Sequence, residues 1–170
     1  MRRILCALSL IATLFIVNAY AKNNNSPAGY WQQVSDTTNK PQSIIYLWLD
    51  KDNVLYGKVV SGFLVNGNPP KTVCTDCPTP FTDKPILNMQ ILWGFTAQEP
   101  GYWNGGHILD PNSAAIYRCN LTLQNNNNDL KVRGYIGISL FGRTQIWHRL
   151  TTEQALTLSK TAYQTSLTTS

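Results

Sequence analysis

The stretch that decides the fold is residues 130–149, which reads LKVRGYIGISLFGRTQIWHR. Apolar and polar residues alternate along it, a glycine recurs every few positions, and it ends in Trp147 and Arg149. Alternation of this kind is typical of β-strands that bury one face. The sequence therefore predicts two strands here, over residues 130–138 and 144–149.

The rest of the chain repeats this pattern, with turn-forming residues between the apolar runs. Residues 61–84, which are rich in Gly and Pro, are expected to form a long loop. The expected strands, about eight in all, cover residues 29–34, 44–49, 54–60, 86–95, 102–109, 115–123, 130–138 and 144–149. Successive antiparallel strands avoid exposed edges best by closing on themselves. The predicted fold is all-β, a single antiparallel up-and-down β-barrel.

A helix is expected after the last strand, over residues 150–166. Thr151 and Gln154 have the spacing of a capping box, in which each side chain bonds the backbone of the other. Residues 167–170, which are rich in Thr and Ser, are expected to be a frayed tail.

The first 21 residues have the composition of a signal peptide. Arg2 and Arg3 precede an apolar run that ends in Ala19-Tyr20-Ala21, a small-x-small cleavage pattern. We expect export to the bacterial periplasm or medium, a disordered linker at 22–28, a barrel domain at 29–149 and no transmembrane segment in the mature chain.

The charge of the chain excludes an obvious nucleic-acid surface. The formal net charge is +5, and the basic residues are scattered along the sequence. A nucleic-acid-binding face usually carries a basic stripe. We therefore expect no nucleic-acid partner.

Three cysteines follow the expected cleavage site. Cys74 and Cys77 are close in sequence in a Pro- and Thr-rich segment, so we expect a local disulfide between them in an oxidising compartment. Cys119 falls in an apolar strand pattern and is expected to be a buried thiol. The alternative is a zinc site built from the three cysteines and His107.

Several segments resemble domain-of-unknown-function family 2147. They are the stretch quoted above, the run Gly105-Gly106-His107-Ile108-Leu109-Asp110-Pro111 and the triplet Tyr117-Arg118-Cys119. The resemblance implies a small exported bacterial protein with a barrel topology and no established activity. Ala114 stands where the family pattern has a glycine, which puts the geometry of that turn in doubt.

Gly29-Tyr30-Trp31 and Arg149 also resemble the Gly-x-Trp and the late arginine of lipocalin-like barrels. The resemblance implies that Arg149 stacks on Trp31 and closes one end of the barrel. Both residues are expected to be structural.

Aromatic residues suggest a ligand site inside the barrel. Trp48, Trp93, Trp103 and Tyr117 are expected to line a cavity for a small apolar or lipid-like ligand. The alternative is that they fill the core of a non-catalytic structural or interaction module, since an eight-stranded barrel has room for either.

A polar group accompanies the aromatic residues. Asp110 with Arg133 or Arg143 is a candidate for binding a charged head group, because the arginine fork suits carboxylate and phosphate. The alternative is a structural turn with an ion pair at the rim of the barrel.

Catalytic patterns are missing from the sequence. The two histidines, His107 and His148, stand apart from a nucleophile motif, and Ser139 lacks the Gly-x-Ser-x-Gly spacing. We expect a monomeric, non-catalytic protein without cofactor or metal. Leu140 and Phe141 are expected either to contact a partner or lipid surface from a hairpin tip, or to plug the barrel mouth.

Overall fold

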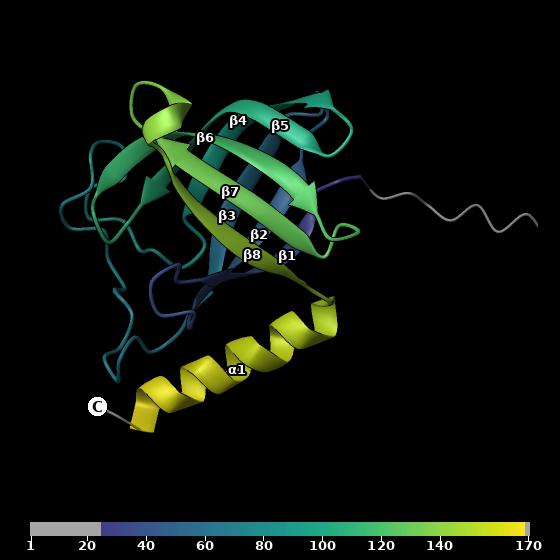
Figure 1. Ribbon diagram of the computed structural model, residues 1–170. Coiled ribbons are helices and arrows are strands. Elements are labelled where there is room, and N and C mark those ends of the chain that lie inside the picture. Colours follow the sequence, from purple (N-terminus) through teal and green to yellow (C-terminus); the bar gives the residue numbers. More distant parts are fainter. Residues whose placement is uncertain (1–24, 169–170) are drawn as a thin grey trace, which may run out of the picture.

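The computed structural model describes residues 25–168, and side chains up to residue 162. Eight antiparallel strands follow one another around a closed barrel (Figure 1). They are β1 (Gly29–Val34), β2 (Pro41–Leu49), β3 (Leu55–Gly62), β4 (Gln90–Glu99), β5 (Tyr102–Asp110), β6 (Ala115–Gln124), β7 (Asp129–Tyr135) and β8 (Arg143–Leu150). The predicted all-β, up-and-down barrel is confirmed. The expected signal peptide lies outside the described residues.

The barrel closes where β8 pairs with β1. Tyr30 lies opposite Leu150, Trp31 opposite Arg149 and Gln32 opposite His148. This seam pairs the first strand with the last, so the sheet has no free edge. We call the end of the barrel that holds the start of β1 the lower end. The opposite, upper end carries the connections 35–40, 63–89, 111–114 and 136–142.

Seven of the eight strands have limits that differ from the predicted ones, and in two of them, β4 and β7, part of the predicted range forms a turn. β4 begins at Gln90, because residues 86–89 form a turn in which Asn88 takes a φ of 64° and donates to the carbonyl of Val59. β7 ends at Tyr135, and a 3-10 turn, η1 (Ser139–Phe141), follows it. In both places the apolar residues extend beyond the strand, so hydrophobic pattern alone misplaces the strand end.

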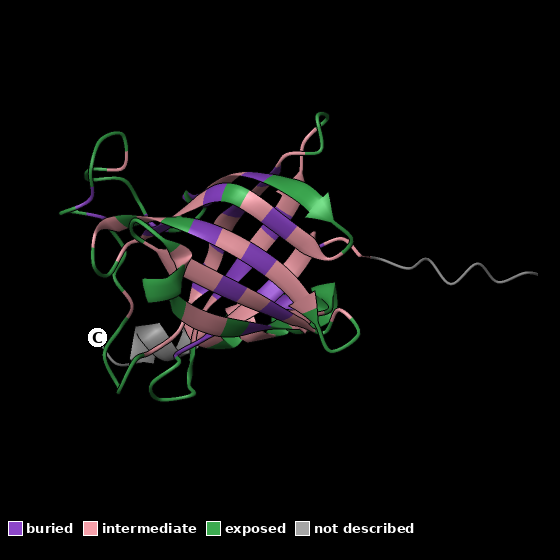
Figure 2. Cartoon of the chain, turned by 45° about the horizontal axis from the view of Figure 1, so that its top comes forward, coloured by how far each residue is buried: buried purple, intermediate pink, exposed green. Residues whose placement is uncertain are grey.

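Side chains of the strands alternate between the interior and the outer face, which Figure 2 shows as bands of buried and more exposed residues. β3 is the regular case, with every second residue buried from Leu55 to Ser61. The middle of the barrel is filled. A Cβ atom at Gly57 would lie 2.4 Å from Leu47, and one at Gly106 would lie 2.3 Å from the Phe95 ring. Atoms this close leave no unoccupied space at either position.

The loop 63–89 is tied to the sheet by aromatic contacts. Phe81 packs against Trp93 of β4 with 5.6 Å between ring centroids, and Trp93 stacks on His107 of β5 at 5.7 Å. The expected disulfide between Cys74 and Cys77 is present, and both residues are buried in the loop.

Helix α1 (Thr152–Thr168) runs along the outside of the barrel and contacts β1, β3 and β8 (Figure 1). The capping box is confirmed, since Gln154 N donates to Thr151 Oγ1 and Thr151 N donates to Gln154 Oε1. The helix begins at Thr152 and includes Thr168. The expected helix limits, 150–166, and the expected start of the frayed tail at residue 167 were therefore wrong. Helical hydrogen bonding continues through this polar segment. The described part of the chain has no helix long and apolar enough to span a bilayer.

Candidate functional site

The lower end of the barrel is closed by Trp31 and Arg149. The guanidinium carbon of Arg149 lies 4.2 Å from the centroid of the Trp31 ring. Trp31 is fully buried, and its Nε1 donates to the carbonyl of Pro27 at 2.7 Å. The contact implied by the lipocalin resemblance is therefore present.

Arg149 also holds two separate segments over this end. It donates to the carbonyls of Asn127 at 2.6 Å, Ala28 at 3.0 Å and Ser26 at 3.0 Å. Burial lowers the pKa of Arg149. The disordered linker expected at 22–28 is thus wrong for its described part, because these hydrogen bonds order residues 26–28 against the barrel.

A polar chain lines the upper interior, above the apolar middle. Trp147 Nε1 donates to Gln145 Oε1 at 3.0 Å, and Gln33 Nε2 donates to the same oxygen at 3.2 Å. Ser43 Oγ in turn donates to Gln33 Oε1. Trp147 is fully buried, whereas Gln145, Gln33 and Ser43 are only half-buried. The interior therefore changes from buried and apolar to polar and partly solvent-accessible towards the upper end.

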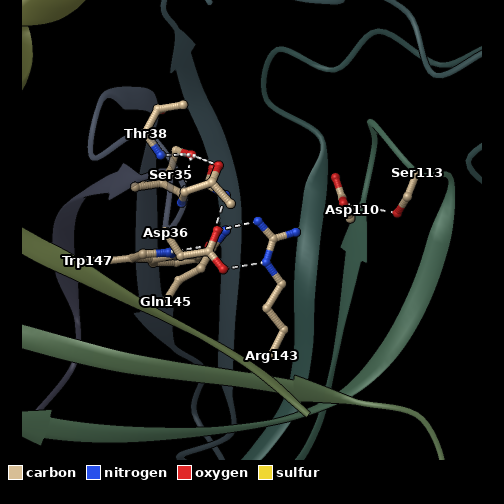
Figure 3. A network of polar contacts seen from close by, with 10 residues as sticks. Ser35, Asp36, Thr38, Asp110, Ser113, Arg143, Gln145 and Trp147 are labelled. Carbon is tan, nitrogen blue, oxygen red and sulfur yellow. Dashed lines mark hydrogen bonds and ion pairs between the residues drawn. The ribbon is translucent and has the colours of Figure 1, made fainter. Parts of the chain in front are cut away.

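Arg143 stands at the top of this chain and binds Asp36 through two nitrogens (Figure 3). Its Nε donates to Asp36 Oδ2 at 2.6 Å, and Nη2 forms the second contact. The hydrogen bond to Arg143 lowers the pKa of Asp36, and the same bond raises the pKa of Arg143. The side chain of Arg143 has a relative solvent exposure of 62%, so solvent still reaches it.

Asp110 lies near this pair without bonding to it (Figure 3). Its Oδ1 accepts from the backbone N–H of Asn112 at 2.9 Å, and its Oδ2 accepts from Ser113 Oγ at 2.9 Å. Ser113 is also 3.4 Å from the Tyr117 hydroxyl. Asp110 forms no ion pair with Arg133 or Arg143, because its carboxylate is used within its own turn, as the structural alternative expected.

Arg133 is excluded from the interior by its strand register. It lies one residue from Gly134, whose Cβ position faces Tyr117 and Ile108 inside the barrel. Arg133 therefore points outward. There it donates to the carbonyls of Ser139 and Leu140 and to Thr144 Oγ1. Its observed role is to hold the turn between β7 and β8.

The four aromatic residues expected to line one cavity lie in different places. Trp103 is buried in the core, and Tyr117 faces the upper interior. Trp48 is on the outer face, stacked between Tyr46 and Tyr56 at 6.2 and 5.9 Å. Trp93 is also outside, beneath Phe81. Because side chains along a strand alternate between the interior and the outer face, these four residues do not share one cavity. The expectation that they line a single ligand cavity was wrong.

Sequence reasoning missed Asp36, Gln33 and Gln145. A signal was available on β8, where Arg143, Gln145, Trp147 and Arg149 share the inward face at a spacing of two. Asp36 gave no such signal, because it lies in a loop and meets Arg143 only through the closure of the barrel.

The cysteines do not form a metal site. The sulfurs of Cys74 and Cys77 are bonded to each other, so they are not thiolate ligands, and the zinc alternative fails. Cys119 is a free, buried cysteine, and burial raises the pKa of its thiol. Within residues 25–168, no cluster of three or more His, Cys, Asp or Glu side chains is arranged to hold a metal ion.

One open groove of about 360 Å³ lies outside the barrel, between the end of β8 and the first turns of α1. It is lined by Leu150, Glu153, Gln154, Thr157 and Leu158. The groove is separate from the upper interior, so it does not serve the polar chain described above.

Comparison with known proteins supports the architecture. Residues 29–149 match the family described as "Uncharacterized protein conserved in bacteria (DUF2147)". The solved structure of protein HP1028 from the human pathogen Helicobacter pylori, described as belonging to the lipocalin family, is similar with a TM-score of 0.65. The two sequences are 21% identical, and the similarity covers 78% of this chain and 88% of that one. At this identity the likeness concerns the fold alone. No curated protein matches the chain.

Proposed function

We propose that this chain, which belongs to the DUF2147 family of uncharacterized bacterial proteins, is a non-catalytic binding protein with its ligand site at the upper end of the barrel. The observation that carries the proposal is the position of Arg143. This arginine faces the interior of a lipocalin-like barrel, stays accessible to solvent, and already binds a carboxylate, that of Asp36. A site that accepts an internal carboxylate has the geometry to accept an external one.

The residues around Arg143 define the class of ligand. Its fork suits a carboxylate or phosphate group, and Tyr117 and Gln145 offer hydrogen bonds beside it. Ile108 provides apolar contact on the same inward face. The filled middle of the barrel leaves room for only a short apolar part. We therefore propose a small amphiphile with an anionic head, a narrower class than the apolar ligand expected from the aromatic residues.

The compartment and the assembly state form part of the proposal. The signal-like residues 1–21 support export to the bacterial periplasm or medium. A closed barrel has no strand edge that needs a partner chain, which supports a monomer. Catalysis is not proposed, because the site combines one arginine, two carboxylates (Asp36 and Asp110) and neutral donors without an activated nucleophile.

A second candidate function follows from the packed interior. The contacts at Gly57 and Gly106 favour a filled barrel, and a filled barrel suits a structural or protein-interaction module. On this alternative, Asp36 and Arg143 only fasten the loop 35–40 to β8.

Calorimetric titration with decanoate and octyl phosphate tests the proposal. We expect the wild type to bind at least one of them, and Arg143→Gln to weaken that binding by about tenfold or more, the loss of a charged hydrogen bond. Asp36→Asn should tighten binding, because it removes the internal competitor. Arg118→Gln, the same charge change on the outer face, is the matched control and should bind as the wild type does.

Two outcomes would overturn the proposal. One is the absence of heat with both amphiphiles for a wild-type protein that is folded by circular dichroism. The other is unchanged affinity in Arg143→Gln. Either result would favour the filled structural module.

A further inference from the structure

The loop between β7 and β8 exposes an unusual amount of apolar surface. Ile136, Ile138, Leu140 and Phe141 have relative exposures of 72%, 60%, 76% and 80%. We call these four residues the apolar tip. Large exposed apolar groups that lie together mark a contact site on a soluble protein. The plug expected as one alternative for Leu140 and Phe141 is wrong, because both side chains point into solvent.

The apolar tip is held outward by the backbone of its own loop. Arg133 Nε donates to the carbonyl of Ser139 at 2.9 Å, and its Nη2 donates to that of Leu140 at 3.1 Å. Gly142 passes so close to the carbonyl of Gly134 that a Cβ there would lie 2.7 Å from the oxygen. The exposed state is therefore a fixed conformation, and docking would cost little ordering of the chain.

We propose that the apolar tip inserts into the surface of an anionic lipid bilayer. The chemistry of the loop favours lipid over a protein partner. Residues 136–142 contain no charged side chain, and Ser139, the one polar residue among them, is engaged by Arg133. Such a surface gains from entering hydrocarbon, but it offers few directional bonds with which to recognise a protein.

Charge complementarity selects anionic lipid. Arg133 lies directly behind the apolar tip, and Arg118 pairs in register with Tyr135 at its base. In the described part of the chain, neither arginine has a carboxylate within 4.0 Å. No acidic side chain therefore neutralises either charge. The exposed Arg118 can bond lipid phosphates directly, whereas Arg133, whose N–H groups are used within the loop, attracts them through its charge. Without residues 1–21, which contain Arg2 and Arg3, the chain keeps 12 basic and 9 acidic residues, and this net charge of +3 acts in the same direction.

The apolar tip sits at the upper end, beside the start of β8 (Figure 1). Insertion would turn this end of the barrel towards the bilayer and leave the closed lower end in water. The inference does not depend on a ligand at Arg143, and it stands if the amphiphile titration fails.

Vesicle co-sedimentation tests the inference with the purified protein. The probes are vesicles of phosphatidylcholine alone and vesicles of phosphatidylcholine with an equal amount of phosphatidylglycerol. We expect binding to the anionic vesicles that weakens with added salt. The variant Leu140→Ser/Phe141→Ser should bind about tenfold or more weakly, because it removes most of the inserted apolar area. Leu156→Ser, which removes an exposed leucine from α1, is the matched control and should bind normally.

A second variant keeps the test decisive if the double variant unfolds. In Phe141→Trp, the new indole should shift its emission to the blue with anionic vesicles and be quenched by brominated lipid. No wild-type binding to anionic vesicles would overturn the inference, as would full binding by a folded double variant. An unshifted emission spectrum of the Phe141→Trp variant, measured as the difference from wild type, would overturn it too.

Discussion

Trp31 and Arg149 are direct partners across the seam between β1 and β8, and they also form the plug at the lower end of the barrel. The contact that closes the sheet is thus the contact that closes the barrel end. Because the guanidinium also binds the carbonyls of Ser26, Ala28 and Asn127, this one side chain ties the segment before β1 and the loop between β6 and β7 to its own strand, β8.

Replacing Arg149 with glutamine should destabilise the protein by about 2–4 kcal/mol, through loss of a partly desolvated cation–π contact and of charged hydrogen bonds. Urea unfolding followed by circular dichroism measures this change. Arg118→Gln, on the exposed outer face, should lose less than about 0.5 kcal/mol. Equal midpoints for the two variants would contradict the assigned role of Arg149.

Gly106 is required by the Phe95 ring, which would lie 2.3 Å from an added Cβ. Gly106→Ala should therefore cost about 1–3 kcal/mol, the range for overpacking a filled core. Gly134→Ala is the control, because its Cβ would meet Tyr117 at an ordinary 3.5 Å. Thermal unfolding measures the melting temperatures of the Gly106→Ala and Gly134→Ala variants. If Gly106→Ala were no less stable than Gly134→Ala, the barrel interior would have free volume after all.

Ala114 lies in the turn between β5 and β6, and its φ is 56°. The left-handed region is unfavourable for alanine and free for glycine. Ala114→Gly should therefore raise stability by about 0.5–1 kcal/mol, a gain that chemical denaturation resolves. The neighbouring Ala115→Gly, in β6, should lower stability instead. A destabilised Ala114→Gly variant would show that the methyl group, which packs near the core, outweighs the backbone strain.

The lowered pKa of Asp36 predicts how the stability of the protein depends on pH. Its hydrogen bond to Arg143 lowers its pKa in the folded state, so the unfolded chain binds a proton more readily. The stabilisation is complete above the ordinary aspartate pKa, about 3.9, and is lost as pH falls through the lower folded value. Melting temperatures of wild type and Asp36→Asn should differ at pH 7, begin to converge near pH 4, and meet once the pH is below the folded pKa of Asp36. If the difference in melting temperature between the two proteins did not change with pH, the charge of the Asp36 carboxylate would not stabilise the fold.

Most strand positions were predictable, because alternation is a local property of the sequence. β1 begins and ends at the predicted residues, and the capping box of α1 was visible in Thr151 and Gln154. The errors fall where an apolar residue has a role other than in a strand. Ile86 and Met89 are buried from a turn, and Ile136 and Ile138 are exposed on a loop.

The candidate site was less predictable, since alternation defines two faces without saying which is inside. Gly94 and Gly105, with φ of 78°, add irregularities that shift the alternation along β4 and β5. Trp93 was therefore expected inside and lies outside, packed against Phe81.

The sequence by itself determined the eight strands, the order in which they follow and the residues that can share a face, because these depend on neighbours along the chain. Only the tertiary structure decided that Arg143 binds Asp36, 107 residues away, and that Asp110 is left to its own turn. Such pairings arise when closure of the barrel brings β1 beside β8. Contacts of this range depend on the whole path of the sheet, so no local pattern encodes them.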